Sequence, residues 1–375
     1  MLYRKFGNTG VKISILGFGS MRLPMEEKNG RWTVKEEESI KMIHYSFEQG
    51  VNYIDSAYMY CNGESEIIVG KALKGWREKV YVSTKIPVWE VGKTSDYRMF
   101  LEKQLKKLDV DYIDFYHLHG LNEKTFNEKV LHFDLIREAE KAKQEGLIKH
   151  ISFSFHDRPE IMKKIIDSGP FETVLCQYNL LDRVNEESIA YAHSKGVGVV
   201  VMGPVGGGRL STSDVLINVF KGAILSTPEI ALRFVFSNEN VSVALSGMGN
   251  IKMVEENVHT ASKFNSLTKK EKELLDNFIE ERRKKEEIPC TACRYCQPCP
   301  QGVAIPEIFQ LMNYYTIYGL KKFAIEQYAN IGKNPDDKRK KADACIECKK
   351  CEEVCPQKIK ITDHLKKFHK ILSSQ

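Results

Sequence analysis

Several features that would place this chain in a common functional class are missing. Its longest apolar run, around "VGVVVM", is far shorter than the roughly 20 residues that a membrane-spanning helix needs. The opening residues "MLYRKFGNTG" contain no apolar signal-peptide core. The net charge is only +6 over 375 residues, and no basic stripe interleaved with aromatic residues runs along the sequence. We therefore expect a cytoplasmic protein with no membrane-spanning segment and no nucleic-acid partner.

Cysteine is scarce over most of the sequence. Only Cys61 and Cys176 lie in residues 1–285, whereas eight of the ten cysteines lie in residues 286–375. This density is too low for a small disulfide scaffold, and a cytoplasmic protein keeps its thiols reduced. The eight clustered cysteines are therefore predicted to bind metal, and Cys61 and Cys176 are not expected to be ligands.

Short β-rich runs alternate with amphipathic helical segments over the first 265 residues. The eight runs are 13–19, 51–55, 80–85, 113–119, 150–155, 173–178, 196–203 and 241–247. No glycine-rich G-x-G-x-x-G follows the first run, which disfavours a doubly wound sheet. Eight strand–helix units predict instead an α/β protein with a closed eight-stranded β/α (TIM) barrel at residues 1–285, and the cysteine-rich residues 286–375 form a second domain.

The predicted strands end in polar side chains. Chemistry on a β/α barrel takes place at the C-terminal ends of its strands. Asp55 closes the second predicted strand, Lys85 the third and His119 the fourth. Each is ordinary at a strand end when taken alone. An acid, an amine and an imidazole that converge on one barrel mouth, beside Tyr58 and Tyr60, predict an active site.

These motifs resemble those of the aldo-keto reductase family. "NYIDSAYMYCNGESE" is similar to the family's strand-two motif, "VSTK" to its lysine motif and "DYIDFYHLHG" to its histidine motif. The opening "FGNTGVKISILGFGSMRLP" is similar to the family's N-terminal hairpin and first strand, so the resemblance covers about residues 1–265. It implies reduction of a small carbonyl-type substrate by a catalytic tetrad of Asp55, Tyr60, Lys85 and His119.

Elementary chemistry agrees with these roles. Reducing a carbonyl requires a proton for the oxygen, and a tyrosine of ordinary pKa, about 10, is a sluggish donor at neutral pH. The Lys85 ammonium favours the phenolate of Tyr60, and Asp55 holds that ammonium in place. His119 orients the substrate oxygen by hydrogen bonding.

Two neighbouring residues leave alternatives open. Tyr58 is a second candidate proton donor, although the family's five-residue interval after Asp55 favours Tyr60. His117 shares one face of an extended strand with His119, so the sequence leaves open whether His117 also contacts the site.

The resemblance also implies a nicotinamide nucleotide, NADP or NAD, at the barrel mouth. The residues that it assigns to this cofactor are Gly19, Ser20, Met21, Ser154, Gln177, Met202, Gly203, Pro204, Val205, Gly247, Met248, Glu256 and Asn257. The sequence departs from the family at Phe155, where an asparagine is expected, and at Met202, where a stacking tyrosine is expected. The basic residues that hold a 2′-phosphate are also replaced, although Lys252 is a candidate substitute. A flavin such as FMN in the barrel is the rival interpretation.

The two cysteine motifs indicate iron–sulfur clusters. "CIECKKCEEVCP" is the C-x-x-C-x-x-C-x-x-x-C-P pattern of bacterial 4Fe-4S ferredoxins, and "CTACRYCQPCP" differs only in having two residues before its last cysteine. Structural zinc is the alternative, but it explains neither the third close cysteine nor the proline that ends each motif. The predicted ligands of two 4Fe-4S clusters are Cys290, Cys293, Cys296, Cys299, Cys345, Cys348, Cys351 and Cys355.

Two-cluster ferredoxins exchange their fourth cysteines, so each motif completes the other motif's cluster. This chain resembles a helical dicluster ferredoxin domain fused to an aldo-keto reductase barrel, with two helices expected between the motifs. The resemblance implies one cluster held by Cys290, Cys293, Cys296 and Cys355, and another held by Cys299, Cys345, Cys348 and Cys351. Ligation within each motif is the alternative.

Three functions are consistent with these features. The first is an oxidoreductase whose barrel reduces a carbonyl or related small substrate and whose clusters exchange electrons with a ferredoxin or flavoprotein. The second is a nucleotide-dependent reductase with purely structural clusters, and the third is an electron-transfer or redox-sensing module without turnover. Clusters pass single electrons whereas carbonyls accept hydride, so the first function requires a converter such as a flavin. The substrate is not readable from the sequence.

Overall fold

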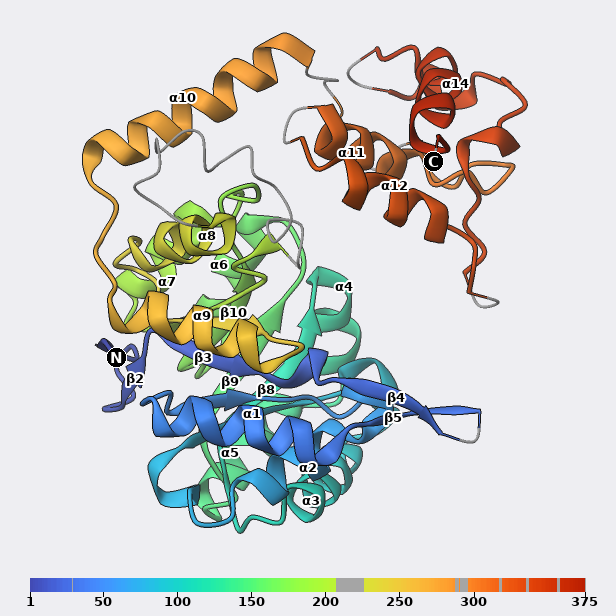
Figure 1. The fold of residues 1–375 in the computed structure, drawn as a ribbon. Coiled ribbons are helices and arrows are strands. Elements are labelled where there is room, and N and C mark those ends of the chain that lie inside the picture. Colours follow the sequence, from blue (N-terminus) through green and yellow to red (C-terminus); the bar gives the residue numbers. More distant parts are fainter. Residues whose placement is uncertain are drawn as a thin grey trace. The chain divides into compact units, whose positions relative to one another are not determined.

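Among the residues that the computed structural model describes, eight parallel strands close into a barrel (Figure 1). The strands follow one another around the barrel in chain order, and the last pairs with the first. Their bounds are β3 Leu16–Gly19, β6 Tyr53–Asp55, β7 Tyr81–Ile86, β8 Ile113–Leu121, β9 Ile148–Phe155, β10 Thr173–Gln177, β11 Gly198–Met202 and β12 Val243–Gly247. The predicted eight-stranded β/α barrel is confirmed.

The structure describes residues 1–28, 30–206, 226–286, 290, 296–316, 319–334, 337–355 and 358–374. The chain divides into two compact units, one of residues 1–208 with 228–267 and the other of residues 209–227 with 268–375. Among the predicted cluster ligands, Cys293 lies outside the described residues. No helix in the described ranges is both long and apolar enough to cross a membrane.

Helices surround the barrel because their apolar residues recur on one face. In α3 (Asp96–Leu108) the buried side chains are Tyr97, Phe100, Leu101, Gln104 and Leu108, which repeat at helical spacing. The other helices of this unit are α1 Glu36–Glu48, α2 Ser65–Ala72, α4 Glu123–Thr125, α5 Leu135–Gln144, α6 Pro159–Ser168, α7 Glu186–Ser194, α8 Thr227–Phe236 and α9 Ile251–Ser262. Short 3-10 turns are η1 Ser20–Arg22, η2 Tyr60–Gly63, η3 Arg77–Lys79 and η4 Val88–Glu90, and η5 Phe126–Leu131 is a π-helix.

An N-terminal hairpin forms the floor of the barrel. Strands β1 (Tyr3–Lys5) and β2 (Lys12–Ser14) pair antiparallel, and Phe6 in the turn lies 4.7 Å from the ring of Phe115. The Arg4 guanidinium donates to the backbone carbonyls of Asn238 at 3.0 Å and of Val241 at 2.5 Å. The buried core here consists of Phe6, Ile13, Tyr53, Phe115, Leu175, Val200, Val243 and Leu245. These strand residues precede the strand ends, so the apolar core lies below the polar mouth.

A second hairpin was not predicted from the sequence. Strands β4 (Met25–Lys28) and β5 (Arg31–Val34) pair antiparallel between the first barrel strand and α1. Figure 1 shows this hairpin extending away from the barrel as a two-stranded ribbon.

The second unit is helical in the residues described. Its helices are α10 Lys269–Glu286, α11 Ile305–Thr316, α12 Lys321–Asn330, α13 Lys350–Glu353 and α14 Ile361–Leu372, with the 3-10 turn η8 Ala342–Ala344. The rings of Phe309 and Phe368 pack 5.1 Å apart, and the Tyr328 hydroxyl lies 2.7 Å from His369 Nδ1. Helices α11 and α12 confirm the two helices expected between the cysteine motifs.

Candidate functional site

Asp55 and Lys85 form a buried ion pair at the ends of β6 and β7. Lys85 Nζ lies 2.5 Å from Asp55 Oδ1, and it donates to the Ser56 carbonyl at 2.6 Å. The Ser83 hydroxyl donates to Asp55 Oδ2 at 2.7 Å. The lysine and aspartate side chains are 1% and 4% exposed. Burial lowers the pKa of Lys85, but the charges and hydrogen bonds of Asp55 and Tyr60 together raise it above its ordinary value, so the amine is held as an ammonium.

Tyr60 lies beside this ammonium. It follows β6 in the turn η2, and Lys85 Nζ lies 4.9 Å from the centre of its ring. Burial raises the pKa of the Tyr60 phenol, and the charge and hydrogen bond of Lys85 only partly offset that rise. The phenol therefore retains its proton at neutral pH, as a proton donor must.

The structure places Tyr58 elsewhere. Its ring packs 5.2 Å from Phe100 and lies under the Lys107 ammonium at 4.2 Å, and both of those residues belong to α3. Of the two candidate proton donors, Tyr60 is the one that the fold brings next to Lys85.

His119 closes the other side of the mouth. Its half-buried ring lies 6.1 Å from the ring of Tyr60 and 5.0 Å from the ring of Trp89. Burial, followed by the charge of Lys85, lowers the pKa of His119 to about 2. The imidazole is therefore neutral at physiological pH, and it is able to hydrogen-bond an oxygen without transferring a proton to it. Trp89 was missed in the sequence, because its proximity to His119 depends on the turn η4 after β7.

His117 lies one step deeper in the barrel than His119. It is fully buried and pairs in register with Lys85 on one side and Ser152 on the other. Neither of its ring nitrogens makes a hydrogen bond of normal geometry with a residue that the structure describes. Burial and then the charge of Lys85 lower the pKa of His117 to about 3. The ring is therefore a neutral polar group directly beneath the site.

The residues assigned to the nicotinamide end lie at neighbouring strand ends. Ser154 is buried near the end of β9, where its hydroxyl accepts from the Gly120 amide at 2.7 Å. Gln177 ends β10 and its side chain lies against Gly203, where a Cβ would come within 2.8 Å of Gln177 Nε2. The φ of +63° at this position favours glycine, whereas the close contact is with the flexible end of the Gln177 side chain, which is able to shift. Met202 ends β11 and packs on the barrel core, and the loop continues through Pro204 and Val205.

The residues near the first strand have different surroundings. The buried Ser20 hydroxyl donates to the Asp55 carbonyl at 2.8 Å and so joins η1 to β6, whereas Met21 is exposed. Gly19 ends β3 and pairs with Asp55 on one side and Gly247 on the other.

Arg22 is a basic residue that sequence reasoning missed. Its side chain lies against Gly247, where a Cβ would meet Arg22 Cδ at 3.1 Å. The proximity arises only because the barrel closes between β12 and β3, a pairing that local sequence does not reveal.

The residues assigned to adenine are not equally accessible. Glu256 is exposed, 3.9 Å from the Lys252 ammonium. The Asn257 amide is buried and donates to the Ser246 hydroxyl at 2.9 Å, and Met248 is buried as well. The roles assigned to these residues stay predictions.

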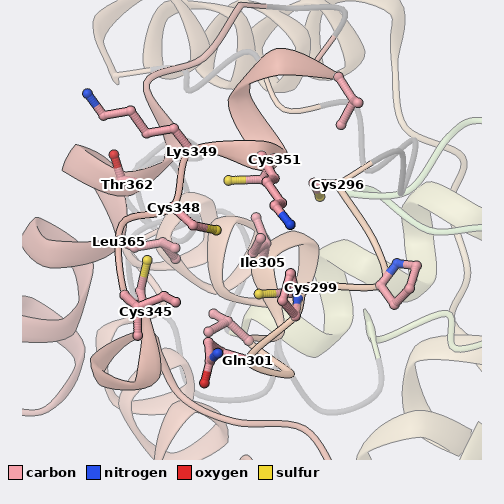
Figure 2. Close-up of a pocket in the computed structure, with 16 residues that line it drawn as sticks. Cys296, Cys299, Gln301, Ile305, Cys345, Cys348, Lys349, Cys351, Thr362 and Leu365 are labelled. Carbon is pink, nitrogen blue, oxygen red and sulfur yellow. The ribbon is translucent and has the colours of Figure 1, made fainter.

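Cysteines from both motifs line one cavity of about 190 Å³ in the second unit. They are Cys296, Cys299, Cys345, Cys348 and Cys351. Figure 2 shows the sulfurs of Cys299, Cys345, Cys348 and Cys351 gathered around the same space. Cys355 is buried and is not among the lining residues, and Cys290 is half-buried.

This donor set fits an iron–sulfur cluster better than a single ion. Within the described ranges, no three His, Cys, Asp or Glu side chains converge closely enough to hold one metal ion. A 4Fe-4S cluster instead needs thiols that each bind a different iron, and these are spaced more widely. Five thiols around one cavity supply more than the four ligands of a single cluster.

Comparisons with known proteins agree with this fold. The model described as "Aldo/keto reductase family" matches residues 15–280, and that of the "4Fe-4S dicluster domain" matches residues 289–359. L-galactose dehydrogenase of Arabidopsis thaliana is 28% identical over 291 residues, which cover 70% of this chain and 89% of the plant protein. The probable aldo-keto reductase 1 of Glycine max is 29% identical over 255 residues, covering 65% of this chain and 71% of its own length.

A solved structure extends the likeness to three dimensions. The holo form of an aldo-keto reductase from Bacillus halodurans aligns with 74% of this chain and 96% of its own chain, at 28% identity and a TM-score of 0.63. Fold and site thus define an oxidoreductase built on a β/α barrel. The chain belongs to the aldo/keto reductase family, and its reductase domain is followed by a dicluster domain that implies two 4Fe-4S clusters.

Proposed function

We propose that the barrel reduces the carbonyl group of a small molecule, with Tyr60 as the proton donor. The observation that carries this proposal is the position of Lys85, which is paired with Asp55 and lies 4.9 Å from the centre of the Tyr60 ring. Tyr60 keeps its proton until negative charge develops on the substrate oxygen. The Lys85 ammonium then stabilises the phenolate that remains, so its charge acts in the transition state.

His119 is proposed to hold the carbonyl oxygen. Its neutral imidazole supplies an N–H donor at the mouth, across from Tyr60, and it does not compete with Tyr60 as an acid. Trp89 stands next to His119 and is exposed, so it offers an aromatic wall to the substrate.

A nicotinamide nucleotide is the proposed hydride source. When bound, it supplies two electrons and one hydrogen to the carbonyl carbon, while the proton from Tyr60 completes the alcohol. Ser154 and Gln177 lie at strand ends suited to its carboxamide, and the Bacillus halodurans relative is described as a holo form. Arg22 beside Gly247 offers positive charge for a 2′-phosphate and favours NADP over NAD. A flavin such as FMN in the barrel finds no support in the comparisons.

The clusters are proposed to exchange single electrons with a ferredoxin or flavoprotein. Each 4Fe-4S centre carries one electron at a time, whereas carbonyl reduction consumes two electrons and two protons in all. A partner flavoprotein would convert between the one-electron transfer of the clusters and the two-electron reduction of the carbonyl.

The proposal is tested by Tyr60→Phe, with Tyr58→Phe as the matched control. Anaerobically purified proteins are given NADPH or NADH and a panel of small aldehydes and ketones, and alcohol formation is measured together with iron and sulfide content. Tyr60→Phe should abolish reduction and leave cluster content unchanged, whereas Tyr58→Phe should retain activity because its ring packs on α3. If Tyr60→Phe keeps more than about a tenth of wild-type turnover, a barrier change below about 1.4 kcal/mol, another group is the acid.

A further inference from the structure

Part of the wall of the cysteine cavity is also molecular surface. Ile346, Cys348, Lys349, Lys350 and Val354 line the cavity and are exposed to solvent. Ile346 is 63% exposed and Val354 is 52% exposed. Figure 2 shows the Lys349 side chain extending away from the cysteine sulfurs. These residues therefore connect the cavity wall with the solvent-facing surface.

Two exposed apolar residues lie next to predicted cluster ligands at this surface. Isolated exposed apolar side chains are common and need no explanation. Here, however, Ile346 directly follows Cys345, and Val354 directly precedes Cys355, so both belong to the predicted cluster-binding motif. An apolar surface next to a redox centre allows a partner to approach closely without desolvating charged groups.

The charge around this surface is positive. Residues 337–355 and 358–374 contain eleven Lys and Arg against six Asp and Glu. The Glu347 carboxylate is paired with Lys366 at 2.8 Å, and that of Glu352 accepts from the Thr362 amide and hydroxyl at 2.8 and 2.7 Å. Lys349 and Lys350 form no ion pair with any residue that the structure describes. Glu352 also interacts electrostatically with Lys349 and Lys360, and among the described residues Glu353 forms no ion pair. The surrounding region is basic overall.

We propose that the surface formed by Ile346, Cys348, Lys349, Lys350 and Val354 docks a small acidic electron-carrier protein. The proposal rests on the proposed function, in which the clusters exchange electrons with a protein partner. The reduced carrier loses one electron and the cluster behind this surface gains it, with no transfer of protons or atoms. The lysines steer carboxylates of the carrier toward the surface, and the apolar residues meet at the centre of the contact. Such a small patch suits the weak, transient complexes that electron carriers form.

The test measures binding, independently of turnover. Holoprotein with both clusters assembled is immobilised under anaerobic conditions, and its affinity for an acidic single-cluster ferredoxin is measured at low and at high salt. Cytochrome c, a basic carrier, is the opposite-charge probe. The variants are Lys349→Glu/Lys350→Glu and Ile346→Ser. The matched control is Lys321→Glu/Lys322→Glu on α12, whose lysines are also exposed and lie outside the cavity wall.

The two variants should fail in different ways. Reversing both lysines should weaken ferredoxin binding by about tenfold at low salt and by much less at high salt, because screening removes the steering charge. Ile346→Ser should weaken binding at both salt concentrations, because it removes apolar contact and no charge. The control variant should bind like wild type. Visible absorbance before and after dithionite reports whether the clusters of each variant are intact.

Three results would overturn the proposal. They are wild-type protein that does not bind the acidic ferredoxin, wild-type protein that prefers cytochrome c, and lysine reversal that has no more effect than the control. None of these results depends on carbonyl reduction. A protein that binds the ferredoxin through this surface and reduces no carbonyl would instead contradict the proposed barrel chemistry alone.

Discussion

At the scale of single residues, the charge of Lys85 determines the state of the histidines around it. Burial and then the Lys85 ammonium lower the pKa values of His117, His119 and His156. After burial and Lys85, His156 and His117 add smaller contributions that lower the pKa of His119 further. All three rings are therefore neutral, so they act through hydrogen bonds and leave proton transfer to Tyr60.

Replacing His117 with leucine should make folding less sensitive to acid. An unfolded histidine has a pKa of about 6.5, whereas burial and Lys85 hold the folded His117 at about 3. Between these values the unfolded state binds one more proton at this site, so wild-type stability falls as the pH falls. His117→Leu should remove that dependence, up to about 1.4 kcal/mol per pH unit, from the free energy of unfolding. Denaturant unfolding between these pH values measures it.

The control for this comparison is His132→Leu, at an exposed histidine. It should leave the slope of stability against pH close to that of wild type. Equal slopes for wild type and His117→Leu would show that the buried ring is protonated in the folded protein.

The sequence was sufficient to predict that Asp55, Lys85 and His119 meet at the barrel mouth. It was not sufficient to predict which other residues surround them there. Asp55, Lys85 and His119 follow recognisable runs, so barrel geometry alone places them at one end. Arg22 and Trp89 carry no such signal, because their positions depend on barrel closure and on a turn. The net pKa shift of Tyr60 also required the structure, since burial outweighs the favourable charge of Lys85.

At the scale of elements, the turn after β6 is held in an unusual conformation next to the proposed proton donor. Cys61, Asn62 and Gly63 all have positive φ, at 51°, 57° and 82°. The β4–β5 hairpin braces them, because the Asn62 amide donates to the Trp32 carbonyl at 3.1 Å. The Glu64 carboxylate accepts from the Thr33 hydroxyl and the Val34 amide, each at 2.9 Å. The hairpin therefore supports the backbone that presents Tyr60.

Loosening this brace should slow catalysis more than it weakens substrate binding. Glu64→Ala removes the acceptor for two hairpin donors, and we expect a roughly tenfold lower kcat with KM little changed, because the proton donor is less well positioned. Thr33→Val removes one of the two donors and should have a smaller effect. Steady-state kinetics with any carbonyl substrate that the wild-type protein reduces provides the measurement. An unchanged kcat in Glu64→Ala would exclude a positioning role for the hairpin.

The hairpin had a signal in the sequence that the barrel pattern obscured. An Asn-Gly pair separates the two strands, and this pair is a strong hairpin signal. The strands themselves, MEEK and RWTV, are short and mostly polar, so they do not resemble buried barrel strands. In contrast, β10 and β11 are almost continuously apolar, as strands covered on both faces must be.

The assignment of cysteines to clusters is testable one residue at a time. Cys299 lines the same cavity as Cys345, Cys348 and Cys351, as Cys296 also does, whereas Cys355 does not line it. Cys299→Ala should therefore first destabilise the cluster held by the second motif, and selective thiol labelling under anaerobic conditions identifies the thiols that are released. Cys61→Ala, in the barrel unit, is the control. If labelling finds Cys290, Cys293 and Cys296 instead, each motif ligates its own cluster.

At the scale of the whole molecule, the two units depend on different sources of stability. The barrel buries a large continuous core, whereas the second unit has a small core around Phe309 and Phe368 and an array of cysteines. Small domains of this kind need metal to reach stability, because they bury too little apolar surface.

Removing iron should therefore unfold one unit and spare the other. After anaerobic chelation, we expect the helical signal of α11, α12 and α14 to be lost and the thermal transition of the barrel to remain near its original temperature. Circular dichroism and calorimetry on the same samples separate the two transitions. If chelation lowers the transition temperature of the barrel as much as that of the second unit, the stability of the barrel also depends on the clusters.

The floor of the barrel has a consequence for the order in which this protein is made. Phe6 packs beneath strands that extend as far as Leu245, and Arg4 binds carbonyls at Asn238 and Val241. The ribosome must therefore synthesise about two thirds of the chain before Phe6 and Arg4 can contact these partners. Until then the apolar side chains at the N-terminus stay exposed to solvent. The cysteine-rich segment is made after the last barrel strand. The barrel strands are thus all synthesised before the first cluster cysteine, and a nascent chain stalled before Leu245 would be a natural client for chaperones.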